Sequence, residues 1–157
     1  MAEEIQLHPD LQALVDDQFA FAGRLQALGS FAPLAASMNP AGEITGAALV
    51  TSEVAIDLSN LSADEGVGLL TRQFIDAAQR GEIKASAIFF HGHNDGGPAP
   101  RPAATEAEAN CLVVFLDHRD GPAVAAVFNY RQATDGRWVY APPFFIRKKA
   151  IVFAPRP

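Results

Sequence analysis

Residues 109–142 read ANCLVVFLDHRDGPAVAAVFNYRQATDGRWVYAP. This stretch contains three segments rich in apolar, β-branched and aromatic side chains, at residues 109–117, 122–131 and 136–142. The dipeptides Asp120-Gly121 and Asp135-Gly136 separate them, and Asp-Gly favours tight hairpin turns because it tolerates positive φ. The pattern therefore predicts three consecutive antiparallel strands that form a meander.

Two amphipathic helices are predicted before this meander. In the first, residues 9–28, apolar side chains recur at every third or fourth position. The second covers residues 62–80, where Ser62 and Glu65 have the spacing of a capping box and Gly81 marks the end. Both helices are expected to lay an apolar face on a sheet.

Three further extended segments complete the predicted sheet. Residues 32–38 and 44–50 flank turn-forming residues and predict a hairpin, and residues 82–91 predict a strand buried on both faces. The order is helix-strand-strand-helix-strand-strand-strand, which is an α+β fold with an antiparallel sheet of five or more strands and two helices. The length of 157 residues is that of one domain, residues 1–157, with a flexible Gly- and Pro-rich loop at residues 92–105.

The composition excludes several classes of function. The formal net charge is −6 and the only compact basic cluster is Arg147-Lys148-Lys149, so a basic stripe for binding nucleic acid is absent. No apolar stretch reaches the roughly 18 residues of a membrane span, and the acidic start of the chain is unlike a signal peptide. Neither a phosphate-binding glycine loop nor a dinucleotide fingerprint occurs, so no cofactor is predicted. We expect a cytoplasmic protein in which the single cysteine, Cys111, is buried and inert.

The predicted topology resembles that of roadblock and profilin-like domains, in which helices pack on an antiparallel sheet. A second resemblance rests on four runs between Gly81 and Arg131, namely Gly81-Glu82-Ile83-Lys84-Ala85, Leu116-Asp117-His118-Arg119-Asp120-Gly121, Val127-Phe128 and Tyr130-Arg131. With these runs the chain resembles a group of small, uncharacterised bacterial proteins without established function. That resemblance implies a bacterial source and carries no catalytic residue.

A candidate metal site follows the buried strand, in the run His91-Gly92-His93-Asn94-Asp95-Gly96-Gly97. This run resembles the metal-binding motif of the metallo-β-lactamase superfamily, H-x-H-x-D-H. It departs from that motif at Gly96, where the family has a histidine, and four histidines in the chain are too few for the family's remaining ligands. Residues i, i+2 and i+4 of an extended chain share one face, so His91, His93 and Asp95 are candidate ligands of one metal ion. The other interpretation is a polar strand end that runs into a solvated loop.

Four aromatic residues in the last strands form a candidate interface or ligand surface. Phe128 and Tyr130 share one face of their strand, as do Trp138 and Tyr140, because side chains alternate with a period of two. One interpretation is cross-strand packing in the core. The alternative is a surface at which an apolar ligand or a protein partner binds.

These observations favour a non-catalytic bacterial module that acts through protein–protein contact or small-ligand binding. Asp117 and His118 are adjacent on a strand and point to opposite faces, so they do not predict a general base, and no catalytic residue is assigned. With 49% hydrophobic and 19% charged residues, the chain is expected to form a homodimer anchored by Trp138 and Tyr140. The alternative is a small metal-dependent enzyme or metal-binding protein that uses His91, His93 and Asp95.

Overall fold

The computed structural model describes residues 7–27, 33–48, 63–94, 101–102, 109–121 and 123–153. Two helices and eight strands occur in this described part of the chain. They are α1 (Pro9–Ala27), β1 (Leu34–Met38), β2 (Ile44–Ala48), α2 (Ala63–Gln79), β3 (Ala85–His93), β4 (Arg101–Pro102), β5 (Cys111–His118), β6 (Val124–Gln132), β7 (Trp138–Tyr140) and β8 (Phe144–Arg147). The fold is α+β, and the order of the elements agrees with the predicted one.

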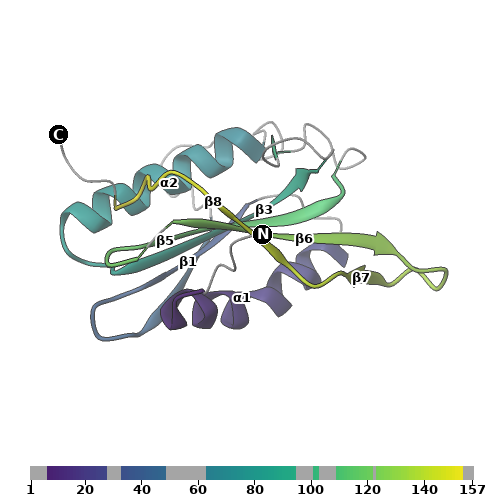
Figure 1. The fold of residues 1–157 in the computed structure, drawn as a ribbon, viewed down its shortest axis with the longest axis horizontal. Helices are drawn as coiled ribbons and strands as arrows, with labels where there is room; N and C mark the ends of the chain where they lie inside the picture. Colours follow the sequence, from purple (N-terminus) through teal and green to yellow (C-terminus); the bar gives the residue numbers. More distant parts are fainter. Residues whose placement is uncertain are drawn as a thin grey trace, which may run out of the picture.

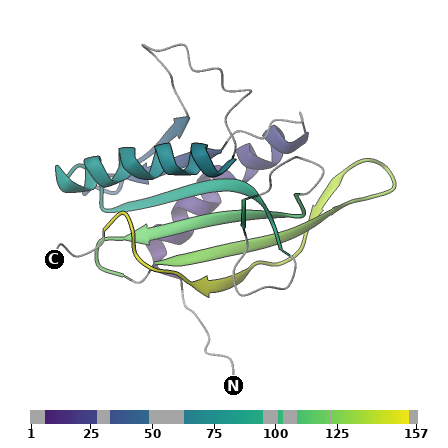
Figure 2. The same ribbon diagram turned by 90° about the horizontal axis from the view of Figure 1, so that it is seen from above.

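The described strands form one antiparallel sheet in the order β2-β1-β3-β5-β6-β7. The short strand β4 lies within the loop predicted at residues 92–105 and pairs with β3. Strand β8 pairs with the first half of β6. The predicted meander is confirmed as β5, β6 and β7, with Val113 opposite Val127 and Tyr130 opposite Tyr140. Strands β7 and β8 follow each other along the outer side of β6, at the edge opposite β1 and β2 (Figure 2).

The two helices cover opposite faces of the sheet and give the molecule three layers (Figure 1). Strand β3 lies in the middle, and its alternate residues serve both cores: Phe89 packs on the α1 side and Phe90 on the α2 side, each 1% exposed. Burial of an aromatic side chain of this size stabilises the fold by roughly 1.5–3 kcal/mol. This two-sided burial explains why Ala87, Ile88, Phe89 and Phe90 are all apolar instead of alternating with polar residues.

The helix end and the hairpin turns depend on different local chemistry. Gly81 has a φ of +72° and closes α2 with hydrogen bonds from Gly81 N to Ala78 O and from Glu82 N to Ala77 O, the Schellman pattern. At Asp135-Gly136 the glycine has the expected positive φ, +87°. Gly121 does not, so the expectation of a positive-φ turn at Asp120-Gly121 is wrong although the hairpin forms. There the backbone N–H of Asp120 instead donates to the ring of His118.

Neither of the two described helices has the length and apolar character that a membrane span requires.

Candidate ligand-binding pocket

A pocket opens on the α1 side of the sheet, between α1 and the strands β6 and β8. Helix α1 packs on β1, β3 and β5. An α-helix with its side chains is about 10 Å across and neighbouring strands are about 4.8 Å apart, so one helix covers about two or three strands. The face of β6 and β8 therefore extends beyond the helix, and a cavity of about 380 Å³ remains there.

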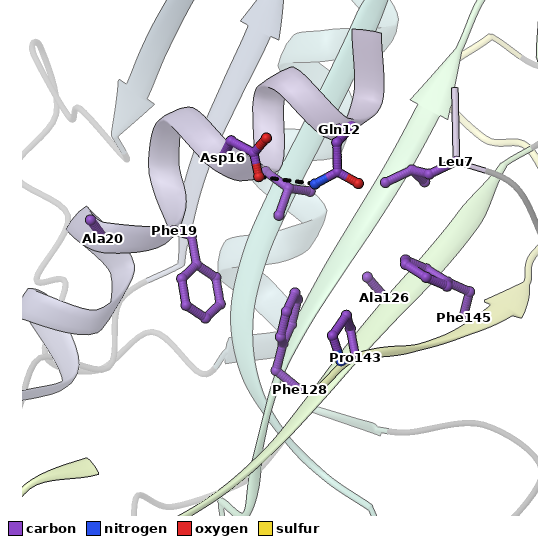
Figure 3. Close-up of a pocket in the computed structure, with 10 residues that line it drawn as sticks. Leu7, Gln12, Asp16, Phe19, Ala20, Ala126, Phe128, Pro143 and Phe145 are labelled. Atoms are coloured by element: carbon purple, nitrogen blue, oxygen red, sulfur yellow. Dashed lines mark hydrogen bonds between the residues drawn. The ribbon is translucent and has the colours of Figure 1, made fainter. Parts of the chain in front are cut away.

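The pocket wall is mainly apolar (Figure 3). Its lining residues come from α1, from β6, from β8 and from the segments that precede α1 and β8: Leu7, Gln12, Val15, Asp16, Phe19, Ala20, Ala126, Phe128, Pro143 and Phe145. The rings of Phe19 and Phe128 contact each other with centroids 4.8 Å apart, tilted by 47°. Ala126 and Phe128 face α1 because alternate residues of β6 point to that side, and Ala126 leaves room above the strand.

One polar pair lies at the rim of the pocket. Gln12 and Asp16 are exposed residues one turn apart on α1, and Gln12 Nε2 donates to Asp16 Oδ1 at 2.9 Å. Among the described residues that line the pocket, Asp16 is the only formally charged one. In the described part of the chain no cation forms an ion pair with it.

The four aromatic residues predicted as an interface or ligand surface lie close together on the α1 face. Phe128 lines the pocket, and Tyr140 contacts Phe19 of its wall at a centroid distance of 5.2 Å. Tyr130 contacts Tyr140, which lies opposite it across β6 and β7, at 5.6 Å and its diagonal neighbour Trp138 at 5.3 Å. Only Phe128 is part of the pocket; the other three continue the aromatic surface away from it.

The predicted metal ligands are only partly brought together. His91 and His93 are alternate residues of β3 and lie on the α1 face, as expected. Burial of His91 lowers its pKa to about 4, so its ring is neutral at neutral pH, and Tyr130 Oη lies 3.4 Å from His91 Nδ1. The Nδ1 atom of His93 is buried and has no hydrogen-bond partner among the described residues. Asp95 lies outside the described residues.

A second group of potential ligands, His8, Asp10 and His118, was not predicted from the sequence. Their ligand atoms lie within 4.8 Å of one another, and His118 Nε2 is 2.8 Å from Asp10 Oδ2. Local sequence patterns give no sign of this group, because Asp10 and His118 are 108 residues apart. The fold brings them together by placing the first turn of α1 over the end of β5.

The hydrogen bonds of this cluster do not fit a metal ion. Nδ1 of His118 accepts the backbone N–H of Asp120, and Nδ1 of His8 accepts that of Asp10. In a neutral imidazole the proton then lies on Nε2, so neither ring has a free lone pair. The two rings stack at 3.8 Å, and Lys84 Nζ lies 3.4 Å from the Asp10 carboxylate. The cluster instead ties the start of α1 to the turn after β5.

Comparisons with protein-family models, with curated proteins and with solved structures gave no match.

Proposed function

We propose that this protein is a non-catalytic bacterial binding module that holds a small apolar ligand between α1 and the strands β6 and β8. The pocket carries the proposal: it is about 380 Å³ in volume and three phenylalanine rings line it. Binding sites for small molecules are commonly concave, mainly apolar and about 300–1,000 Å³ in volume. The resemblance of residues 81–131 to small bacterial proteins supports the bacterial source, and the single buried cysteine agrees with a cytoplasmic location.

The residue types in the pocket support binding rather than catalysis. General acid–base or nucleophilic catalysis requires a group such as His, Cys, Ser, Lys, Asp or Glu within reach of the substrate. Among the described lining residues only Asp16 belongs to these types, and its exposed carboxylate has neither a histidine nor a second carboxylate beside it in that lining. His118 is buried beneath His8 and is not part of the wall.

The expected affinity determines the assay. Ligands contribute between about 0.3 and 1.5 kcal/mol of binding free energy per non-hydrogen atom, and the lower value applies to larger ligands. At the lower value, a compound with about twelve such atoms has a Kd of about 2 mM. The titration must reach the low millimolar range, and the readout must identify the site as well as the affinity.

We test the proposal with 1-naphthalenemethanol, an uncharged compound of this size, titrated into ¹⁵N-labelled protein and followed by chemical shifts. Saturable shifts are expected around Phe19, Phe128 and Phe145. Ala20 lines the pocket from an exposed position on α1, so Ala20→Phe should fill the space and weaken binding at least tenfold. Gln73→Phe, at an exposed position of α2 on the opposite side of the sheet, is the matched control and should bind as wild type.

Two results would overturn this proposal. One is wild-type protein without saturable shifts at low millimolar ligand. The other is a folded Ala20→Phe variant that binds as well as wild type does.

Homodimerisation is a second candidate, favoured by the apolar edge of the sheet. Val139 on β7 and Phe144 on β8 are each 40% exposed, and they lie on consecutive strands along β6. Unpaired edge strands readily pair with a second chain. Light scattering of the wild-type protein at tens of micromolar should then show the mass of a dimer. The Trp138→Ala variant should show the mass of a monomer and remain folded. Monomeric wild-type protein under these conditions contradicts this candidate.

Metal binding by His91, His93 and Asp95 is the alternative class of function. It is favoured by the neutral ring of His91 and by the unpartnered Nδ1 of His93 on the same face. Stoichiometric Zn²⁺ in purified wild-type protein, lost in His93→Ala, would support it. Sub-stoichiometric metal after dialysis against added Zn²⁺ would exclude it.

A further inference from the structure

The charge at the rim of the pocket distinguishes between classes of apolar ligand. Asp16 is the only formally charged residue in the described lining, and the amide of Gln12 holds its Oδ1 at 2.9 Å. One carboxylate oxygen, Oδ2, then lies without an ion-pair partner among the described residues. The described lining residues include neither Lys nor Arg, and the chain as a whole carries a formal charge of −6.

We propose that the ligand is an amphipathic amine, whose apolar body lies among the phenylalanines and whose ammonium group pairs with Asp16. This inference rests on the proposed function. A carboxylate or phosphate in the same place would meet the charge of Asp16 with no basic lining residue to offset it. An ammonium group gains the attraction of that carboxylate and of any aromatic face it approaches, such as that of Phe19 or Phe128.

The size of the preference follows from the exposure of Asp16. An ion pair at an exposed position stabilises a complex by at most about 1 kcal/mol, which is about a fivefold change in Kd, and a cation–π contact adds a similar amount at most. The amine should therefore bind about three- to tenfold more tightly than a neutral compound with the same apolar body. The anion should bind more weakly than the neutral compound.

Three compounds that share the naphthalene ring test this inference at neutral pH: 1-naphthylmethylamine, 1-naphthalenemethanol and 1-naphthoic acid. Asp16→Asn removes the charge and keeps an oxygen that accepts from Gln12. Asp17→Asn is the matched control, because Asp17 is also exposed on α1 and accepts one amide hydrogen bond, from Gln18, but does not line the pocket. Kd values come from the same chemical-shift titration.

The expected order of affinity is amine, alcohol, acid. In Asp16→Asn the amine should lose about threefold to fivefold in affinity relative to the alcohol, and in Asp17→Asn the preference for the amine should persist. Equal affinities for the three compounds, or equal effects of the two substitutions, overturn this inference and leave the proposed function standing. If none of the three compounds binds, the proposed function fails and the inference with it.

Discussion

Replacing Asp117 with alanine removes the polar contact that holds residues 148–152 on the α2 side of the sheet. Asp117 lies near the end of β5 and is 3% exposed. Its Oδ1 is 2.6 Å from Lys148 Nζ. Its Oδ2 accepts the backbone N–H groups of Ile151 at 3.0 Å and Val152 at 3.2 Å. The side chain of Val152 packs into the core beneath α2, so this contact anchors the segment.

The expected loss of stability is large because the groups that contact Asp117 in the wild type remain in place without their acceptor. The side chain of Lys148 is 14% exposed and loses its counter-ion, and two backbone N–H groups lose their acceptor. Removing one member of a buried ion pair costs about 3–5 kcal/mol, and losing a hydrogen bond to a charged group costs about 1.5–3 kcal/mol. These costs overlap, so the free energy of unfolding should fall by about 3–5 kcal/mol. For a domain of this size each 1 kcal/mol lowers Tm by about 2–4 °C, which gives a decrease of about 6–20 °C.

Urea denaturation followed by circular dichroism measures this loss. Asp120→Ala is the matched control: its side chain is 68% exposed in the turn after β5 and pairs only loosely with Arg119, so its effect should stay within about 0.5 kcal/mol. Adding Lys148→Met to Asp117→Ala should recover part of the stability, because the unpaired ammonium is then absent. Equal losses for Asp117→Ala and Asp120→Ala would refute this reasoning.

The hydrogen bond from His118 and the nearby Lys84 lower the pKa of Asp10 in the folded protein. The ionised Asp10 carboxylate therefore contributes its full stabilisation above about pH 4, and this contribution is lost as the pH falls through the lowered pKa of the folded state. The gap in Tm between wild type and Asp10→Asn should therefore narrow from about pH 6 to about pH 3, and a constant gap contradicts this. Gly68→Ala should raise the free energy of unfolding by about 0.5–1 kcal/mol, because the added methyl group meets no atom within 4 Å on α2, whereas Gly136→Ala at φ +87° should lower it. Burial raises the pKa of the Cys111 thiol to about 11, so Ellman's reagent should react with it only as fast as the protein unfolds, and rapid labelling of the native state contradicts its burial.

The fold was largely predictable because its elements have strong local signals. Helix α1 was expected at residues 9–28 and occurs at Pro9–Ala27, and α2 was expected at residues 62–80 and occurs at Ala63–Gln79. Gly81 fixed the end of α2 through its positive φ. Two-residue spacing also predicted the strand faces that carry Tyr130 and Tyr140. The hairpin pairs these two residues, so their rings lie on the same face of the sheet. These features depend on contacts between residues near in sequence or joined by a short turn.

The site was less predictable because it depends on where α1 crosses the sheet. Of the residues singled out from the sequence, Phe128 lines the pocket, while Phe19 and Phe145 were found only in the structure. The periodicity of apolar residues predicts which face of α1 packs on the sheet. It does not predict which strands the helix leaves uncovered. Within the basic cluster at residues 147–149, Lys148 pairs with the buried Asp117. That pair joins β5 to the segment that follows β8, and no local pattern indicates this contact.

The most direct test of a ligand site between α1 and the strands β6 and β8 is an intermolecular nuclear Overhauser measurement on protein saturated with 1-naphthalenemethanol. Contacts between the naphthalene protons and the ring protons of Phe128 and Phe145 are the predicted result, because both rings line the pocket. A saturated complex whose contacts lie on α2, with none to these rings, would contradict it.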